Sequence, residues 1–166
     1  DKSFVSRSAK LNRLLELLRD ILNQGRRALI FSQFTSFLAI VREAFDEEGI
    51  EHLYLDGQTP AAERGNLVMS FQEGATPVFV LSLKAGGTGL NLTAADTVIH
   101  LDPWWNPAVE DQATDRAHRI GQDKPVTVLR LVARDTVEEQ ITALHADKRA
   151  LVADVLEGTN TAARLD

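Results

Sequence analysis

No cysteine occurs among the 166 residues, which excludes a disulfide framework and a zinc site built on thiolates. The four histidines show no H-E-x-x-H spacing, so the sequence predicts no metal held by this chain. No apolar run reaches the length that a membrane span requires. We therefore expect an intracellular protein with no membrane partner.

Basic residues are also scarce, because 18 Lys and Arg stand against 24 Asp and Glu and leave a net charge of -6. Nucleic-acid-binding domains are usually basic, so this charge argues against one unless binding uses a local face and another domain supplies positive charge. A Gly-Lys pair is missing, which excludes a Walker A phosphate loop. Neither G-x-G-x-x-G nor the nucleophile elbow G-x-S-x-G is present.

A content of 44% hydrophobic and 25% charged residues is typical of a globular protein, and the length suits one compact domain over residues 1–166. Short apolar runs predict strands at 28–31, 51–55, 77–83, 97–101 and 126–132. Helical spacing predicts helices at 11–22, 35–49, 59–74 and 106–120, then a last helix from a capping box at 136–139 and a frayed tail at 158–166. This alternation indicates an α/β fold, with a mostly parallel central sheet and helices on both faces.

The starts and ends of these helices are predicted from single residues. We expect Thr35 or Ser36 to cap the second helix, and Thr59 to cap the third with Pro60 in its first turn. Glycines, which adopt left-handed backbone angles at little cost, are expected to end the first three helices at Gly25, Gly49 and Gly74.

Four loops follow predicted strands, at 32–35, 56–59, 82–91 and 102–107. Ligands of parallel sheets bind beyond the carboxyl ends of the strands, so these loops are expected to share one functional edge. The loop at 82–91 contains Gly86, Gly87 and Gly89, whose N–H groups could approach a phosphate. A tight turn between a strand and a helix explains the same glycines, and the glycine cluster by itself favours that interpretation. Of the adjacent Trp104 and Trp105, one is expected to face a cleft or a partner.

The helix predicted at 106–120 carries Gln112, Arg116 and Arg119 at three- and four-residue spacing, which places them on one side. Two guanidinium groups held together suit the binding of phosphate oxygens. An exposed helix surface with an ion pair between Asp115 and Arg119 accounts for the same pattern. Spacing alone leaves both interpretations open.

Taken in chain order, four segments resemble the motor motifs of helicase superfamily two, in the form found in Swi/Snf-type DNA translocases and chromatin-remodelling ATPases. They are LIFSQFT at 29–35, YLDGQT at 54–59 followed by Arg64, SLKAGGTGLNLTAAD at 82–96 and HLDPWWNPAVEDQATDRAHRIGQ at 100–122. The ending DRAHRIGQ is specific to the Swi/Snf branch. The resemblance, which extends from Ser8 to about Leu151, implies a RecA-like three-layer sandwich. It also implies the helicase C-terminal lobe, because the Walker motifs of the family lie on a first lobe that this chain lacks.

The resemblance implies roles for individual residues. Arg116 and Arg119 correspond to catalytic arginine fingers that reach toward ATP and Mg held mainly by the first lobe. The residues expected near the ATP are Gly87, Gly89, Asn91 and Gln112. The residues expected at the DNA are Gln33, Gly57, Thr59, Lys84, Gly86, Thr88 and Trp104. The implied partners are the first lobe of the same polypeptide, double-stranded DNA and a DNA-bound client protein.

Two other functions compete with a DNA-dependent ATPase. The fold could serve as a non-catalytic docking or regulatory module, or the chain could be a free-standing nucleotide-binding enzyme. The family resemblance favours one half of a two-lobe ATPase, which is not expected to turn over ATP by itself. Its expected location is the cytoplasm or nucleoid of a bacterium, or the nucleus of a eukaryote.

Overall fold

The computed structural model describes residues 2–82, 92–102 and 125–131. The helices within these ranges are α1 (Lys2–Asn23), α2 (Thr35–Glu47) and α3 (Ala61–Gln72). The strands are β1 (Ala28–Ser32), β2 (Leu53–Leu55), β3 (Val78–Ser82), β4 (Thr97–His100) and β5 (Thr127–Arg130). The helix predicted at 106–120, the last helix and the tail at 158–166 lie outside the described residues.

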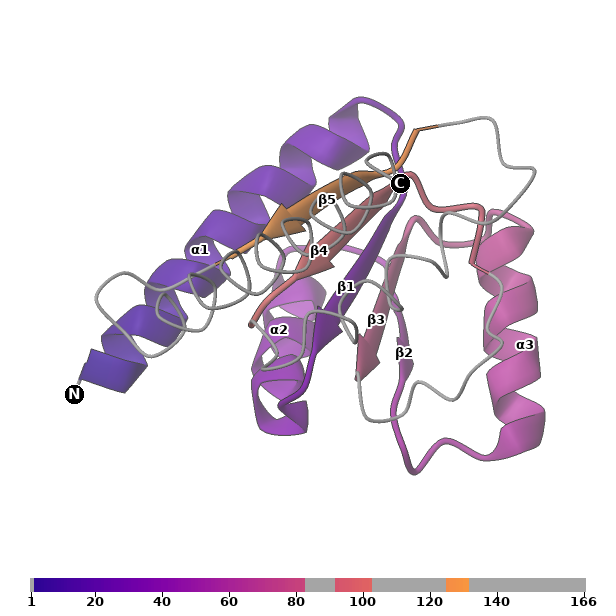
Figure 1. The fold of residues 1–166 in the computed structure, drawn as a ribbon, viewed down its shortest axis with the longest axis horizontal. Helices are drawn as coiled ribbons and strands as arrows, with labels where there is room; N and C mark the ends of the chain where they lie inside the picture. The colour runs from indigo at the N-terminus through magenta and orange to yellow at the C-terminus, as the bar shows by residue number, and fades with distance from the viewer. Residues whose placement is uncertain (1, 83–91, 103–124, 132–166) are drawn as a thin grey trace, which may run out of the picture.

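The five strands form one sheet in the order β2-β3-β1-β4-β5, and every neighbouring pair is parallel (Figure 1). This confirms the predicted parallel sheet. All residues of β1, β3 and β4 are buried, which explains why β1 and β3 are apolar up to a terminal serine instead of alternating with polar residues. The carboxyl ends of all five parallel strands lie at one edge, so the loops after β1, β2 and β4 begin at that edge.

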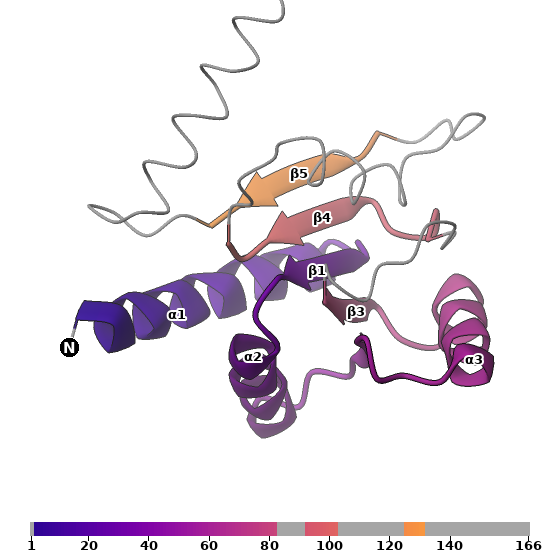
Figure 2. The ribbon, with the colours of Figure 1, turned by 60° about the horizontal axis from the view of Figure 1, so that its bottom comes forward.

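The described helices cover both faces of the sheet (Figure 2). The chain moves from β1 through α2 out to β2, and then returns through α3 to β3. Because connections between parallel strands are right-handed, this reversal of direction places α2 and α3 on opposite faces. The predicted three-layer arrangement, with helices on both sides of the sheet, is confirmed.

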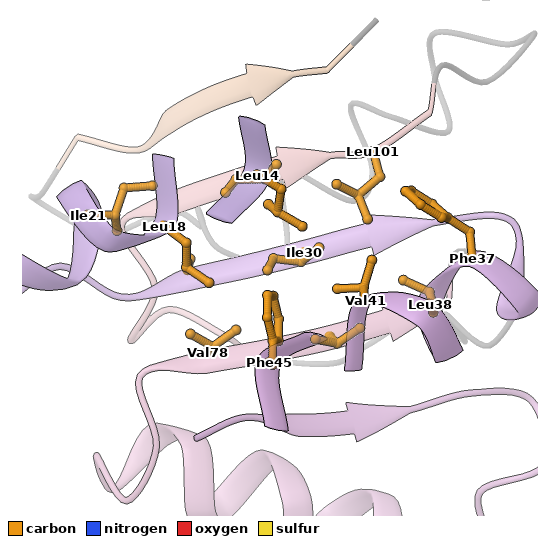
Figure 3. Packing of buried hydrophobic residues seen from close by; sticks show 13 residues of the cluster. Leu14, Leu18, Ile21, Ile30, Phe37, Leu38, Val41, Phe45, Val78 and Leu101 are labelled. Carbon is orange, nitrogen blue, oxygen red and sulfur yellow. The ribbon is translucent and has the colours of Figure 1, made fainter. Parts of the chain in front are cut away.

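One apolar layer lies between the sheet and the pair α1 and α2. Ile30 of β1 lies at its centre, with Leu14 and Leu18 of α1 on one side and Val41 and Phe45 of α2 on the other (Figure 3). The layer across the sheet is built from the alternate strand residues. There Leu29 and Phe31 pack with Phe71 of α3. Successive side chains of a strand point to opposite faces, so one strand supplies both layers.

The predicted ends of the helices are correct, whereas the predicted caps are wrong. Gly25, Gly49 and Gly74 all have positive φ angles, between 69° and 88°. At the start of α2 the N-cap position belongs to Phe34, and Thr35 is already helical. At the start of α3 it belongs to Pro60. Neither residue makes a side-chain capping bond, since phenylalanine and proline side chains have no acceptor. The Thr59 hydroxyl, predicted to cap α3, is used inside the preceding loop.

Candidate functional site at the carboxyl edge of the sheet

Three of the predicted site residues, Gln33, Gly57 and Thr59, lie in the part of the chain that the structure describes. Gln33 follows β1, and the other two follow β2, so all three are at the carboxyl edge of the sheet. The other predicted site residues fall outside the described ranges: Lys84, Gly86, Gly87, Thr88, Gly89, Asn91, Trp104, Gln112, Arg116 and Arg119.

The backbone at Gln33 is held by a carboxylate from the next strand in the sheet. Asp102 follows β4, and its side chain is 2% exposed. Its Oδ2 accepts a hydrogen bond from the Gln33 N–H at 3.1 Å, and its Oδ1 accepts one from the Ser32 hydroxyl. The Ser32 oxygen accepts the Phe34 N–H at 3.0 Å. These bonds fix the β1–α2 loop and occupy the Gln33 N–H.

The loop after β2 is folded around Asp56. Its Oδ1 accepts the Gln58 N–H at 2.9 Å, and its own N–H donates to the Thr59 hydroxyl at 3.1 Å. The Thr59 N–H donates in turn to the Asp56 carbonyl at 3.2 Å. This is the geometry of an Asx turn, in which a carboxylate takes the place of a backbone acceptor. Among the described residues, Gly57 has the only N–H of residues 56–59 with no hydrogen-bond acceptor.

Arg64 and Tyr54 support the same loop from its two flanks. The guanidinium of Arg64, in the first turns of α3, donates to the Thr59 carbonyl at 2.9 Å and the Gly57 carbonyl at 3.3 Å. The Tyr54 hydroxyl donates to Asp56 Oδ2 at 2.9 Å. The Tyr54 ring is covered by Arg42 of α2, whose guanidinium carbon lies 4.0 Å from the ring centroid. These hydrogen bonds therefore hold residues 56–59 in one conformation in the absence of a ligand.

Burial and hydrogen bonding in this loop shift the pKa values of Tyr54 and Asp56. Burial raises the pKa of Tyr54 to about 12, and the hydrogen bond to Asp56 and its negative charge act in the same direction. At Asp56, partial burial acts to raise the pKa, but hydrogen bonds from Tyr54, Gln58 and Thr59 outweigh it, and the pKa is lowered. At neutral pH the pair is thus a neutral phenol donating to a carboxylate.

The sequence interpretation missed the roles of Asp102 and Asp56, although both belong to loops that it selected. A signal existed for Asp56, since Asp followed by Gly and Thr is typical of a side-chain-stabilised turn. No comparable local signal exists for Asp102, because its partners are 69 and 70 positions away in the chain.

Within the described residues, no group of three His, Cys, Asp or Glu side chains could hold a metal ion. The same residues include no helix long and apolar enough to cross a membrane.

Comparisons with known proteins give one consistent result. Residues 9–121 match the family described as helicase conserved C-terminal domain. The C-terminal part of the Fun30 ATPase domain, a solved structure, is 40% identical, with a TM-score of 0.77 over 82% of this chain and 45% of that one. This likeness confirms the RecA-like α/β fold.

Curated relatives come from bacteria and eukaryotes. The chromatin-remodeling ATPase INO80 of Cryptococcus neoformans is 47% identical over 96% of this chain and 9% of its own length. A putative ATP-dependent helicase/translocase of Bacillus subtilis, YwqA, is 44% identical over 93% of this chain and 17% of its own length. An uncharacterized ATP-dependent helicase of Mycoplasma pneumoniae is 42% identical over 93% and 15%. The chain thus spans between 9% and 17% of the length of these relatives.

Proposed function

The chain belongs to the helicase C-terminal domain family and is related to SNF2-type ATP-dependent helicases, and on that premise we propose that it is the second motor lobe of an ATP-dependent double-stranded DNA translocase. One observation carries this proposal. The family match over 9–121 includes the loops after β1, β2, β3 and β4, and a wholly parallel sheet brings the ends of those strands to one edge.

In this proposal Arg116 and Arg119 act as arginine fingers on ATP that the first lobe binds. Gln112 positions them, and Gly87, Gly89 and Asn91 lie near the nucleotide. A guanidinium group stabilises the charge that develops on the transferring phosphoryl group, an effect of about 10³ to 10⁵ in rate. The Mg ion that accompanies ATP is held mainly by the first lobe. This lobe supplies positive charge to a reaction for which another lobe supplies the bound substrate.

On the DNA side, we propose contacts to the phosphate backbone, which suit a motor that moves along any sequence. The proposed contacts come from Gln33, Gly57, Thr59, Lys84, Gly86, Thr88 and Trp104. The geometry supports different roles for two of them. The Gly57 N–H is unoccupied within the described residues and suits a phosphate oxygen, whereas the Thr59 hydroxyl serves the Asp56 turn and shapes the loop. The further proposed partners are the first lobe and a DNA-bound client protein.

The arginine assignment is tested by DNA-stimulated ATP hydrolysis in a protein that contains both lobes. Arg119→Ala should reduce turnover by about 10³-fold or more, while ATP binding, measured by calorimetry, stays near the wild-type value because the first lobe holds the nucleotide. Arg13→Ala is a matched control, since Arg13 lies on α1, is 60% exposed and pairs with Glu16. Exposed ion pairs of this kind contribute little to the stability of the fold, so their loss should not affect turnover. Wild-type turnover in Arg119→Ala would contradict the finger role and favour a docking module.

The half-site character is tested on this chain alone. Calorimetry with ATP and Mg should show no tight binding, and a phosphate-release assay should show no hydrolysis above background, until an SNF2-type first lobe is added. Hydrolysis by the chain alone would identify a free-standing enzyme instead.

A further inference from the structure

We propose that Asp102 is a positioning residue, which holds the β1–α2 loop in the shape that Gln33 needs to contact DNA. The inference deepens the proposed function and rests on it. It assigns a role to a carboxylate that itself touches neither the DNA nor the nucleotide in the proposed mechanism.

The register of the sheet explains why Asp102 reaches this loop. β1 and β4 are neighbours, Phe31 pairs with His100, and the Leu101 N–H extends the ladder to the Phe31 carbonyl at 2.9 Å. The residue after Leu101 therefore lies beside the residues that follow Phe31. Both oxygens of Asp102 are used there, one for the Ser32 hydroxyl and one for the Gln33 N–H.

The bonds restrict the loop without occupying its outer surface. Asp102 is 2% exposed, whereas Gln33 is half-buried and Phe34 is 49% exposed. The carboxylate fixes the backbone at Gln33 directly and at Phe34 through the Ser32 oxygen. A loop that is already ordered loses less conformational entropy when it meets a ligand, so its side chains bind more tightly. Loss of the carboxylate should therefore weaken DNA contact more than it slows turnover at saturating DNA.

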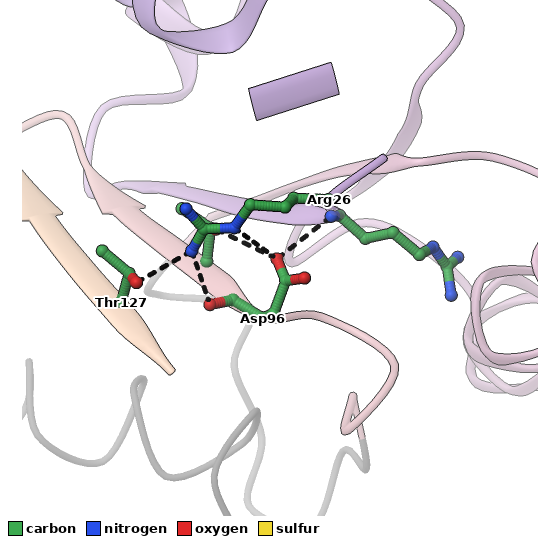
Figure 4. Close-up of polar contacts among 5 residues, drawn as sticks. Arg26, Asp96 and Thr127 are labelled. Atoms are coloured by element: carbon green, nitrogen blue, oxygen red, sulfur yellow. Dashed lines mark hydrogen bonds and ion pairs between the residues drawn. The ribbon is translucent and has the colours of Figure 1, made fainter. Parts of the chain in front are cut away.

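The opposite edge of the same two strands provides a matched control. Asp96 precedes β4, and its Oδ1 accepts the Arg27 N–H at 3.1 Å and the Thr97 hydroxyl at 3.0 Å. It also lies 3.5 Å from the Arg26 guanidinium (Figure 4). Asp96 thus joins β4 to the start of β1 through one backbone N–H, as Asp102 joins β4 to the residue after β1, but at the edge away from the proposed DNA contacts.

The experiment compares Asp102→Asn with Asp96→Asn in a protein that contains both lobes. The readouts are the DNA concentration that gives half-maximal stimulation of ATP hydrolysis, the rate at saturating DNA, and the melting temperature. Asp102→Asn should raise the half-stimulating DNA concentration by roughly tenfold, the scale of one charge-assisted hydrogen bond. It should change the saturated rate by less than about twofold. Asp102→Asn and Asp96→Asn should lower the melting temperature by similar amounts. Only Asp102→Asn should raise the half-stimulating DNA concentration.

A second variant covers the case in which Asp102→Asn does not fold. Ser32→Ala keeps the bond from Gln33 to Asp102 and removes the other, so it should raise the half-stimulating DNA concentration by about threefold. An equal rise in Asp96→Asn, or no rise in either variant of the Asp102 network, would overturn the positioning role. If wild-type ATP hydrolysis did not respond to DNA at all, the proposed function itself would fail, and this result is distinct from the other two.

Discussion

Tyr54 shows how one side chain connects the core to the candidate DNA-facing loop. Its ring lies under Arg42, and its hydroxyl donates to the carboxylate that organises residues 56–59. Burial and the nearby negative charge favour its neutral form, which raises its pKa to about 12. It is also the only tyrosine in the sequence, so its ionisation can be observed directly.

We predict that the phenolate absorbance at 295 nm titrates with a midpoint near pH 12 in the folded chain and near the ordinary tyrosine pKa of 10 after unfolding in urea. The folded state keeps its proton while the unfolded state loses it, so the free energy of unfolding should decrease between pH 10 and about pH 12. Tyr54→Phe should remove this decrease, whereas Asp56→Asn should move the midpoint back toward 10 because it removes the negative charge. A folded-state midpoint at 10 in the wild type would contradict this account.

Gly57 allows a direct test of backbone approach to the loop. A Cβ added there meets no atom within 4 Å, and its φ is outside the left-handed range. Gly57→Ala should therefore leave the melting temperature nearly unchanged, yet raise the half-stimulating DNA concentration several-fold, because the methyl group would stand between the N–H and a phosphate. Gly65→Ala is the control.

Gly65 lies inside α3 and also has free space at its Cβ. Alanine there should stabilise the helix by about 0.5–1 kcal/mol without affecting DNA stimulation. Normal DNA stimulation in Gly57→Ala would exclude a close contact at this loop.

At the scale of elements, Arg27 joins the end of α3 to the sheet. Its guanidinium donates to the carbonyls of Phe71 and Thr76, the latter at 2.8 Å, and lies 4.2 Å above the Phe71 ring. Burial lowers its pKa, opposed by the negative charge of Asp96. A single side chain thus donates hydrogen bonds to one carbonyl at the carboxyl end of α3 and to one in the loop between α3 and β3.

We predict that Arg27→Met lowers the free energy of unfolding by about 2–3 kcal/mol, since two charge-assisted hydrogen bonds and a cation–π contact are lost. Urea denaturation followed by circular dichroism measures this change. Arg26→Met is the matched control, because the Arg26 guanidinium donates to the Thr127 hydroxyl and lies 3.5 Å from the Asp96 carboxylate, away from α3. A loss in Arg26→Met as large as that in Arg27→Met would contradict the proposed anchoring of α3.

At the scale of the whole molecule, the net charge of -6 limits what this lobe can do alone. Its proposed DNA contacts are mostly backbone and uncharged donors, which release few counterions. We predict that the isolated chain binds a double-stranded oligonucleotide more weakly than about 10⁻⁴ M at physiological salt, measured by fluorescence anisotropy. A protein with both lobes should bind more tightly and depend more steeply on salt. Micromolar binding by the isolated chain would show that this lobe carries its own electrostatic site.

The sequence predicted the identity and order of the described elements because the relevant signals are local. Runs such as 28–31 and 77–83 are apolar on both faces, and Gly25, Gly49 and Gly74 end the helices at positive φ as expected. The predicted cap of α3 failed because the Thr59 hydroxyl oxygen accepts the Asp56 N–H of its own loop and not an N–H from the first turn of the helix. A choice between two hydrogen-bond partners depends on loop geometry, which a residue pattern does not specify.

By itself, then, the sequence determined the α/β class, the parallel sheet and the loops that carry the family motifs, since periodicity and motif order are written in neighbouring residues. Only the tertiary structure decided which loops share their hydrogen bonds. The contact of Asp102 with Ser32 and that of Asp96 with Arg27 both arise because β4 pairs with β1, and not with β3, which precedes it in the chain. Strand order is set by packing across the whole sheet, so the carboxylate that holds the Gln33 loop became visible only in the folded chain.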